Sequence, residues 1–166
     1  MKTRQIAQSA VIAAIYVLLT WATLPIGSGL IQCRVAEALC VLPCFTPAAI
    51  PGLFVGCLIS NILSGAVLYD VLFGSLATLA AALLARLVAK KLSPKLSLWL
   101  APLPAVLINA LVVGMVLAYA YGLAQEGTAA YVCILSVGAG QVVACYGLGV
   151  PLTLLLNRYG NSIFHS

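Results

Sequence analysis

The chain has 166 residues, of which 64% are hydrophobic and 7% are charged, and its formal net charge is +5. A soluble domain is roughly 45–50% apolar and about 25% charged, so this composition excludes an ordinary soluble fold and predicts an integral membrane protein surrounded by a lipid bilayer. One helical span needs about 20 apolar residues, which leaves room for roughly five or six spans and little else. The apolar runs do not alternate with polar residues as barrel strands do, so we expect an all-α bundle.

The residue types also exclude several classes of function. The basic residues stand beside apolar runs, a pattern typical of membrane orientation, so we expect no nucleic-acid partner. The six cysteines form no CxxC pair, and the one histidine is His165 near the C-terminus. We therefore expect no metal site, no Cys–His or Ser–His catalytic pair, and no cofactor or enzyme activity in this chain. The cysteines are interpreted as small apolar helix residues.

The predicted helices follow one another with short connections. The apolar run at residues 6–24 is too long for the core of a signal peptide and is expected to be the first helix. Residues 34–45 are mostly apolar and are closed by Pro43 and Pro47, so they are a candidate short second helix. The six predicted helices lie near residues 5–24, 35–46, 47–64, 70–89, 98–123 and 129–157, in a single transmembrane domain over residues 1–166.

Basic residues indicate how the chain is oriented. Lys2 and Arg4 precede the first helix, a basic cluster lies at residues 86–95, and Arg158 follows the last helix. By the positive-inside rule all three sites face the cytoplasm, so the number of crossings between any two of them is even. This parity holds if the short second segment also carries the chain across. The sequence therefore predicts six transmembrane helices with both termini cytoplasmic.

Small residues form a stripe on the first predicted helix. Ala7, Ala10 and Ala14 share one face, since successive residues of a helix are about 100° apart. Small residues at such spacing let another helix approach closely. The stripe serves either packing inside the bundle or docking to a separate membrane subunit, and the sequence leaves both interpretations open.

Acidic residues are rare, and one of them lies within a predicted membrane segment. Asp70 and Glu126 are expected at outer helix ends, where water reaches them. Glu37 lies in the short second helix, one turn after Arg34. An i,i+3 ion pair between the two would offset both charges. A charge near hydrocarbon also costs about 2.5–3.5 kcal/mol on insertion scales and marks a functional site, and the two interpretations are compatible.

Amide side chains add to this polar group. Asn61 closes the third predicted helix, Asn109 lies midway along the fifth, and Gln141 lies within the sixth. Each one alone is explained by an interhelical hydrogen bond, worth about 0.6 kcal/mol. Together with a carboxylate at an outward-open cavity, they would form a recognition site for a planar, hydrogen-bonding ligand.

Residues 32–39 (QCRVAEAL) resemble the Q-x-R-x-[SA]-E-A-L signature of the QueT family, the substrate-binding S components of energy-coupling factor (ECF) transporters for queuosine precursors. The resemblance extends over nearly the whole chain and includes residues 9–14, 42–56, 69–78, 109–114 and 140–152. The chain departs from the family pattern at Gln141, where a glutamate commonly precedes two valines. A member with this change is expected to differ in the precursor it prefers.

The resemblance implies an outward-facing site and no transport without partners, which are a membrane coupling subunit and two cytoplasmic ATPases in the bacterial plasma membrane. It also implies docking of the coupling subunit through the AxxxA face that contains Ala10 and Ala14. The implied ligand is a 7-deazaguanine base, such as queuine or 7-aminomethyl-7-deazaguanine. Glu37 is expected to accept its N–H groups, Asn109 and Gln141 to read its polar edge, and Tyr146 to stack on its ring. The full set of expected ligand-binding residues is Gln32, Arg34, Glu37, Asn61, Asn109, Gln141 and Tyr146.

Three other functions remain open from the sequence. The chain could be an S component for another small vitamin-like substrate, a small stand-alone facilitator, or a structural membrane protein without a ligand. A facilitator needs a polar path through the whole bundle, whereas the predicted polar residues gather in its outer half. The buried amides count against a purely structural protein.

Overall fold

The computed structural model describes residues 3–24, 34–123 and 129–164, with side chains up to residue 158. Over these residues the chain is helical and contains no strand. The prediction of an all-helical protein is therefore confirmed. In chain order the helices are α1 (Thr3–Ala22), η1 (Val35–Cys44), α3 (Ala49–Leu63), η2 (Asp70–Gly74), α4 (Ser75–Lys91), α5 (Pro94–Leu100), α6 (Leu103–Tyr119), α7 (Ala130–Val142), η3 (Val143–Leu148) and α8 (Gly149–Phe164).

Four helical stretches of the described chain are long and apolar enough to cross a membrane, which supports a membrane protein. The first is α1 and the second joins η2 to α4. The third joins α5 to α6 through a short break at Ala101 and Pro102, and the fourth joins α7, η3 and the start of α8. Two shorter apolar helices, η1 and α3, complete the bundle.

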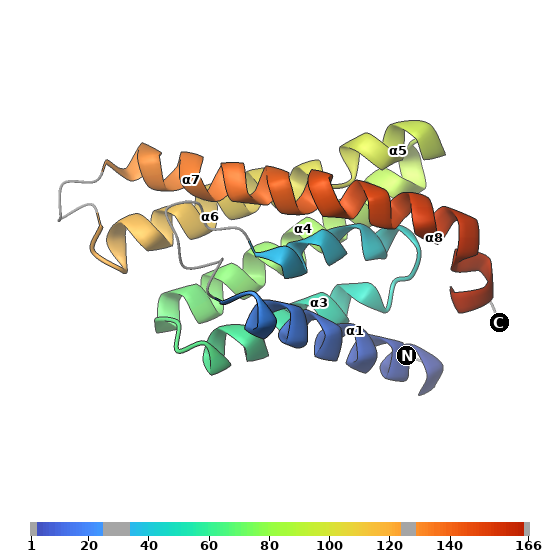
Figure 1. Cartoon of the computed structure of the whole chain (residues 1–166), viewed down its shortest axis with the longest axis horizontal. Coiled ribbons are helices and arrows are strands. Elements are labelled where there is room, and N and C mark those ends of the chain that lie inside the picture. The colour runs from blue at the N-terminus through green and yellow to red at the C-terminus, as the bar shows by residue number, and fades with distance from the viewer. Residues whose placement is uncertain (1–2, 25–33, 124–128, 165–166) are drawn as a thin grey trace.

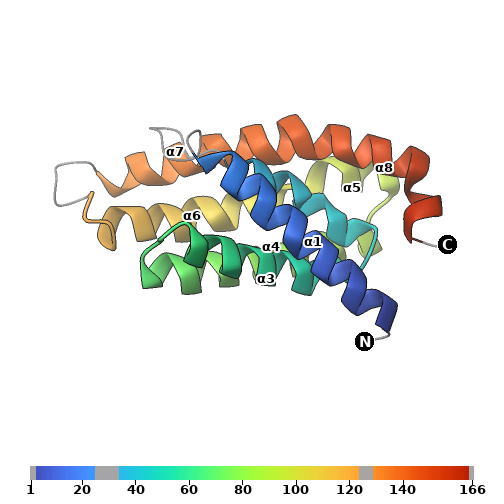
Figure 2. The same ribbon diagram turned by 60° about the horizontal axis from the view of Figure 1, so that its bottom comes forward.

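The long helices lie roughly side by side, and the helix formed by α7, η3 and α8 runs along the whole bundle (Figure 1). The helix α6 packs on α7, α4 packs on α6 and α3, and α1 packs on α3. Figure 2 shows α1 crossing the other helices obliquely. The start of α1, the junction of α4 with α5 and the end of α8 lie at the same end of the bundle in both views (Figures 1 and 2).

Glycines permit the closest helix contacts. A Cβ atom at Gly56 of α3 would lie 2.8 Å from the Cβ atom of Tyr16 in α1, and one at Gly114 of α6 would lie 2.6 Å from the Cα atom of Ile134 in α7. Both distances are far below van der Waals contact, so only glycine allows these backbones to approach so closely. Small residues at interfaces are the usual means of packing helices in lipid.

The short helix η1 lies in the centre of the bundle and contacts α1, α3, α4, η3 and α8. It is a 3₁₀ helix of 10 residues, eight of which are buried. A 3₁₀ helix rises about 2.0 Å per residue, so η1 covers about 20 Å, compared with about 15 Å for an α-helix of that length. The 3₁₀ winding therefore makes this short segment longer than an α-helix with the same number of residues.

The end of η1 is held by a side chain from α4. Arg86 Nη1 donates hydrogen bonds to the carbonyl oxygens of Pro43 and Cys44, both at 3.0 Å. The last carbonyls of any helix have no partner within the helix. The guanidinium of Arg86 therefore satisfies two acceptors that would otherwise be left inside an apolar bundle.

The stripe of small residues on α1 faces away from the bundle. Ala7, Ala10 and Ala14 are exposed, whereas Ile12 and Tyr16 on the opposite face are buried. The three alanines therefore do not pack inside the bundle, and of the two interpretations left open by the sequence, internal packing does not apply.

Candidate ligand-binding site

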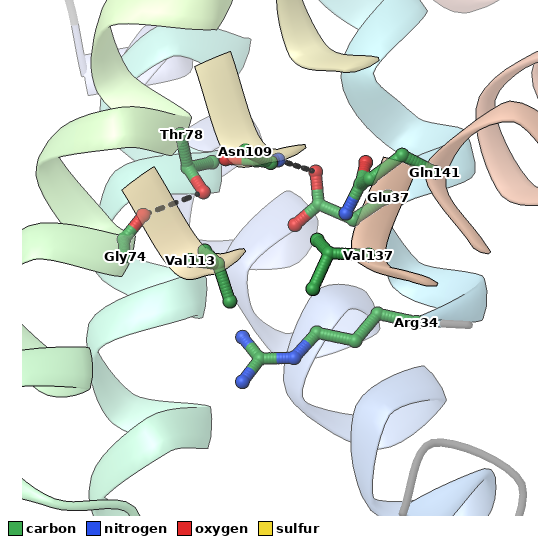
Figure 3. Close-up of a pocket in the computed structure, with 8 residues that line it drawn as sticks. All are labelled: Arg34, Glu37, Gly74, Thr78, Asn109, Val113, Val137 and Gln141. Atoms are coloured by element: carbon green, nitrogen blue, oxygen red, sulfur yellow. Dashed lines mark hydrogen bonds between the residues drawn. The ribbon is translucent and has the colours of Figure 1, made fainter. Parts of the chain in front are cut away.

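Polar side chains from four parts of the bundle meet around one small cavity. The volume of this cavity is about 10 Å³. That is close to the roughly 10–15 Å³ that a single water molecule needs, so the side chains nearly fill the site, and a larger ligand requires them to move apart. The lining residues are Arg34, Glu37, Gly74, Thr78, Asn109, Val113, Val137 and Gln141 (Figure 3).

Glu37 is the central acid of this cavity, and its side chain is held from two sides. Tyr16 Oη of α1 donates to Oε1, and Asn109 Nδ2 of α6 donates to Oε2 at 3.0 Å. Both carboxylate oxygens therefore act as acceptors, as they do in an ionised carboxylate, and each retains further lone-pair capacity. Glu37 is only 3% exposed, and these bonds offset part of the cost of burying its charge.

Arg34 forms its ion pair with Asp70, which follows it by 36 residues, instead of with the neighbouring Glu37. Arg34 Nη2 lies 3.2 Å from Asp70 Oδ2, and this contact joins the start of η1 to the start of η2. Asp70 lies at a helix end as expected, but it is 4% exposed, so the expectation that water reaches it is wrong. Its burial follows from the ion pair and from its place in the first turn of η2, which packs on α3, α4 and α6.

The structure places two of the three predicted amides at the cavity. Figure 3 shows Asn109 and Gln141 on either side of the Glu37 carboxylate. Gln141 Oε1 accepts a hydrogen bond from the Cys145 thiol at 3.4 Å, and the same thiol lies 3.6 Å from the Glu37 carbonyl oxygen. Asn61 is fully buried but does not line the cavity, because its Nδ2 donates to the Asp70 carbonyl oxygen at 3.2 Å.

Two further predicted site residues do not belong to the described cavity. The Tyr146 hydroxyl donates to the Trp99 carbonyl oxygen at 2.9 Å and the ring does not line the cavity. Successive residues on a helix point about 100° apart, and the preceding Cys145 already faces Glu37, so Tyr146 is directed to α5 instead of to the site. Gln32 lies outside the described residues.

Sequence reasoning missed two polar side chains at the site. Tyr16 donates to Glu37 from α1, and its signal was its position midway along a membrane segment instead of at the aromatic belt near an interface. Thr78 of α4 lines the cavity and donates to the Gly74 carbonyl oxygen at 3.1 Å. Threonine commonly bonds to its own helix in this way, so nothing in the sequence distinguishes Thr78 from an ordinary helix residue.

The polar atoms left unpaired near the site are of one kind. Among the described residues, Asn61 Oδ1, Asp70 Oδ1 and Asn109 Oδ1 are buried without a hydrogen-bond donor. All three are acceptors. The ionisable groups add to this character, since Glu37 and Asp70 carry formal negative charges and Arg34 carries one positive charge. Of the three unpaired acceptors only Asn109 Oδ1 belongs to a lining residue, and together with the Glu37 carboxylate it makes the cavity suited to a ligand that presents N–H donors.

A small cavity with several buried polar side chains inside an apolar helical bundle is typical of a membrane protein that handles a small molecule. The chain matches the model of the QueT transporter family over residues 6–158. It therefore belongs to this family and has a role in membrane transport, which confirms the resemblance noted in the sequence. Comparison with curated proteins and with solved structures gives no significant match.

Proposed function

We propose that this protein is the substrate-binding S component of an ECF-type importer and captures a queuosine precursor, a 7-deazaguanine base such as queuine or 7-aminomethyl-7-deazaguanine. The observation that carries this proposal is the buried Glu37 carboxylate, which lies beside Asn109 and Gln141 in a member of the QueT family. Buried acids in membrane segments are costly and mark binding sites.

The chemistry of a guanine-like edge matches these groups. The edge presents two N–H donors beside a carbonyl acceptor. A carboxylate accepts both donors, with bonds stronger than those between neutral groups. An amide group such as that of Gln141 donates to the carbonyl oxygen. Val113 and Val137 supply apolar walls for the flat faces of the ring.

The same proposal includes six membrane crossings with both termini in the cytoplasm of a bacterial cell. It is supported by the position of the start of α1, the α4–α5 junction and the end of α8 at one end of the bundle (Figures 1 and 2). The basic residues Lys90, Lys91 and Lys95 flank this junction. The length that η1 gains as a 3₁₀ helix supports its role as a short span.

Labelling by a membrane-impermeant thiol reagent tests this orientation in cells. In a background without native cysteines, a cysteine introduced at Thr128 should be labelled from outside, and one introduced at Lys91 should not. Labelling of Lys91→Cys but not of Thr128→Cys in intact cells would reverse the orientation.

Transport also requires partners under this proposal. We propose that a membrane coupling subunit docks on the exposed face of Ala7, Ala10 and Ala14, and that two cytoplasmic ATPases supply the energy, with no enzyme activity in this chain. The exposed methyl side chains of these three alanines support the close approach of a second helix.

Calorimetric titration of the purified full-length protein tests the ligand. Queuine or 7-aminomethyl-7-deazaguanine should bind and should also raise the melting temperature, since a ligand at 100 times its Kd stabilises the folded state by about 2.7 kcal/mol. Guanine and unrelated vitamins are the comparison ligands. Binding of a vitamin but of no 7-deazaguanine by folded protein would remove queuosine precursors as substrates.

A further inference from the structure

We propose that Asp70 is a specificity-determining residue that recognises a positive charge on the ligand, so that the site selects a 7-deazaguanine with an amine-bearing side arm over a neutral one. This inference rests on the proposed function and extends the site beyond Glu37, Asn109 and Gln141. It starts from one unpaired oxygen atom and from the chemistry of the atoms around it.

Only one of the two oxygen atoms of the Asp70 carboxylate has a partner among the described residues. Its Oδ2 atom pairs with Arg34 Nη2 at 3.2 Å, whereas Oδ1 is buried and meets no hydrogen-bond donor from the described residues. The side chain is only 5% exposed, so bulk water has little access to this oxygen. Leaving a buried acceptor of this kind without a donor is unfavourable, more so when it is charged. A donor supplied by a ligand would remove this cost.

The unpaired oxygen lies directly behind the wall of the cavity, although Asp70 itself is not one of the lining residues. A Cβ atom at Gly74 would lie 2.9 Å from Asp70 Oδ1, and Gly74 is one of the residues that line the cavity. A larger residue at this position would clash with Oδ1, so only glycine allows the wall of the cavity to lie this close to the unpaired oxygen. The wall of the cavity and the unpaired oxygen are in contact at this point.

The backbone around Asp70 is also specialised. Residues Asp70–Gly74 form a π-helical turn, and Asn61 Nδ2 donates to the Asp70 carbonyl oxygen at 3.2 Å. Such wide turns are rare and occur frequently at functional sites. Here the wide turn brings Asp70 and Gly74 into contact, and the amide of Asn61 fixes it from α3. A side chain held this firmly is suited to selecting between ligands.

The charge of the site favours a cation. Glu37 and Asp70 together carry two formal negative charges and Arg34 carries one positive charge, so these three side chains sum to −1. A buried net charge is costly unless it is compensated. A ligand with one positive charge would neutralise the site, and its N–H groups would face the unpaired oxygens of Asp70 and Asn109.

The two acids fit the two ends of one ligand. On a 7-deazaguanine, the exocyclic amine and the side arm at position 7 leave from opposite ends of the bicycle. With the guanine edge on Glu37 and the side chains moved apart to admit the ring, an ammonium group at the end of the arm would approach Asp70 past Gly74, which lines the cavity in front of it. The aminomethyl compound carries this ammonium group, whereas the cyano compound has a neutral arm on the same ring.

Calorimetry with this ligand pair tests the proposal. Wild-type protein should bind 7-aminomethyl-7-deazaguanine more tightly than 7-cyano-7-deazaguanine. Asp70→Asn should weaken binding of the aminomethyl compound by about tenfold or more, the effect of losing a hydrogen bond to a charged group. Binding of the cyano compound should change by less than about threefold, since its arm carries no charge for Asp70 to meet.

Asp70→Asn leaves the Arg34 charge unpaired, so a second variant is needed to distinguish a loss of recognition from a folding defect. The double variant Arg34→Gln with Asp70→Asn removes both charges and should show the same loss of preference. Equal affinity of wild-type protein for both compounds, or an equal loss of both in the variants, would overturn the role of Asp70 and leave the proposed function in place. Binding of neither compound by folded wild-type protein would overturn both proposals.

Discussion

The two ends of η1 each carry an arginine contact, and the two contacts differ in kind. At the start, Arg34 pairs with the carboxylate of Asp70, next to the cavity and to Glu37. At the end, Arg86 donates to the backbone carbonyls of Pro43 and Cys44. The first contact joins two side chains, whereas the second satisfies backbone carbonyls that have no partner within the helix. One end of η1 is therefore suited to recognition and the other to anchoring.

Replacement of Glu37 should give the largest effect and should affect binding alone. Glu37→Gln keeps the size of the side chain but removes its charge and turns one acceptor into a donor. Because hydrogen bonds to charged groups are worth about 1.5–3 kcal/mol, affinity for a 7-deazaguanine should fall by roughly tenfold to a hundredfold in calorimetric titration.

Thermal unfolding without ligand is the control for this variant. Arg34 keeps its partner Asp70 in Glu37→Gln, and the Tyr16 hydroxyl can rotate to accept a hydrogen bond from the new amide. The melting temperature should therefore stay close to that of the wild-type protein. Unchanged affinity together with lower stability would place Glu37 outside the binding site and make both ends of η1 structural.

Replacement of Arg86 should lower the stability and leave the ligand affinity unchanged, which is the opposite of the result expected for Glu37→Gln. Arg86→Met keeps most of the apolar stem but leaves two buried carbonyls without their charged donor, which costs about 1.5–3 kcal/mol of stability. The melting temperature should fall, while the affinity of the folded fraction for ligand should stay within about threefold of wild type. Arg86→Lys, which retains a donor, should recover part of the stability. A loss of affinity at unchanged stability would contradict an anchoring role.

Replacing Tyr16 tests how much ligand binding at the start of η1 depends on α1, which packs against it. Tyr16→Phe removes one donor to Glu37 and little else, and a single hydrogen bond contributes about 0.5–1.5 kcal/mol. Ligand affinity should therefore change by less than about tenfold, clearly less than in Glu37→Gln when both are titrated side by side. An effect as large as that of Glu37→Gln would mean that Tyr16 itself contacts the ligand.

The smallest effect on ligand binding is expected from substitutions on the exposed face of α1, opposite Tyr16. Ala10→Trp and Ala14→Trp place a large side chain on an exposed surface, so calorimetry should give the same affinity as wild type. Copurification with a coupling subunit should be lost in both variants, because the wide side chain blocks close helix approach. If both variants still copurify and support uptake, the docking face lies elsewhere.

The amino-acid sequence by itself determined the class of the protein and part of its site. Apolar content fixes the membrane environment, because only lipid accommodates so much apolar surface, and the rarity of acids in such segments singles out Glu37. The amides Asn109 and Gln141 were found for a similar reason. These inferences depend on the local composition of a segment, which the sequence states directly.

Only the tertiary structure decided which of these groups meet. Arg34 pairs with Asp70 across 36 residues instead of with Glu37 one turn away, and Tyr146 bonds to Trp99 instead of lining the cavity. Sequence spacing gives the face of a helix on which a side chain lies, but the partner that faces it comes from another helix. That choice depends on how the helices pack, on the 3₁₀ winding of η1 and on the wide turn at Asp70, none of which local composition specifies.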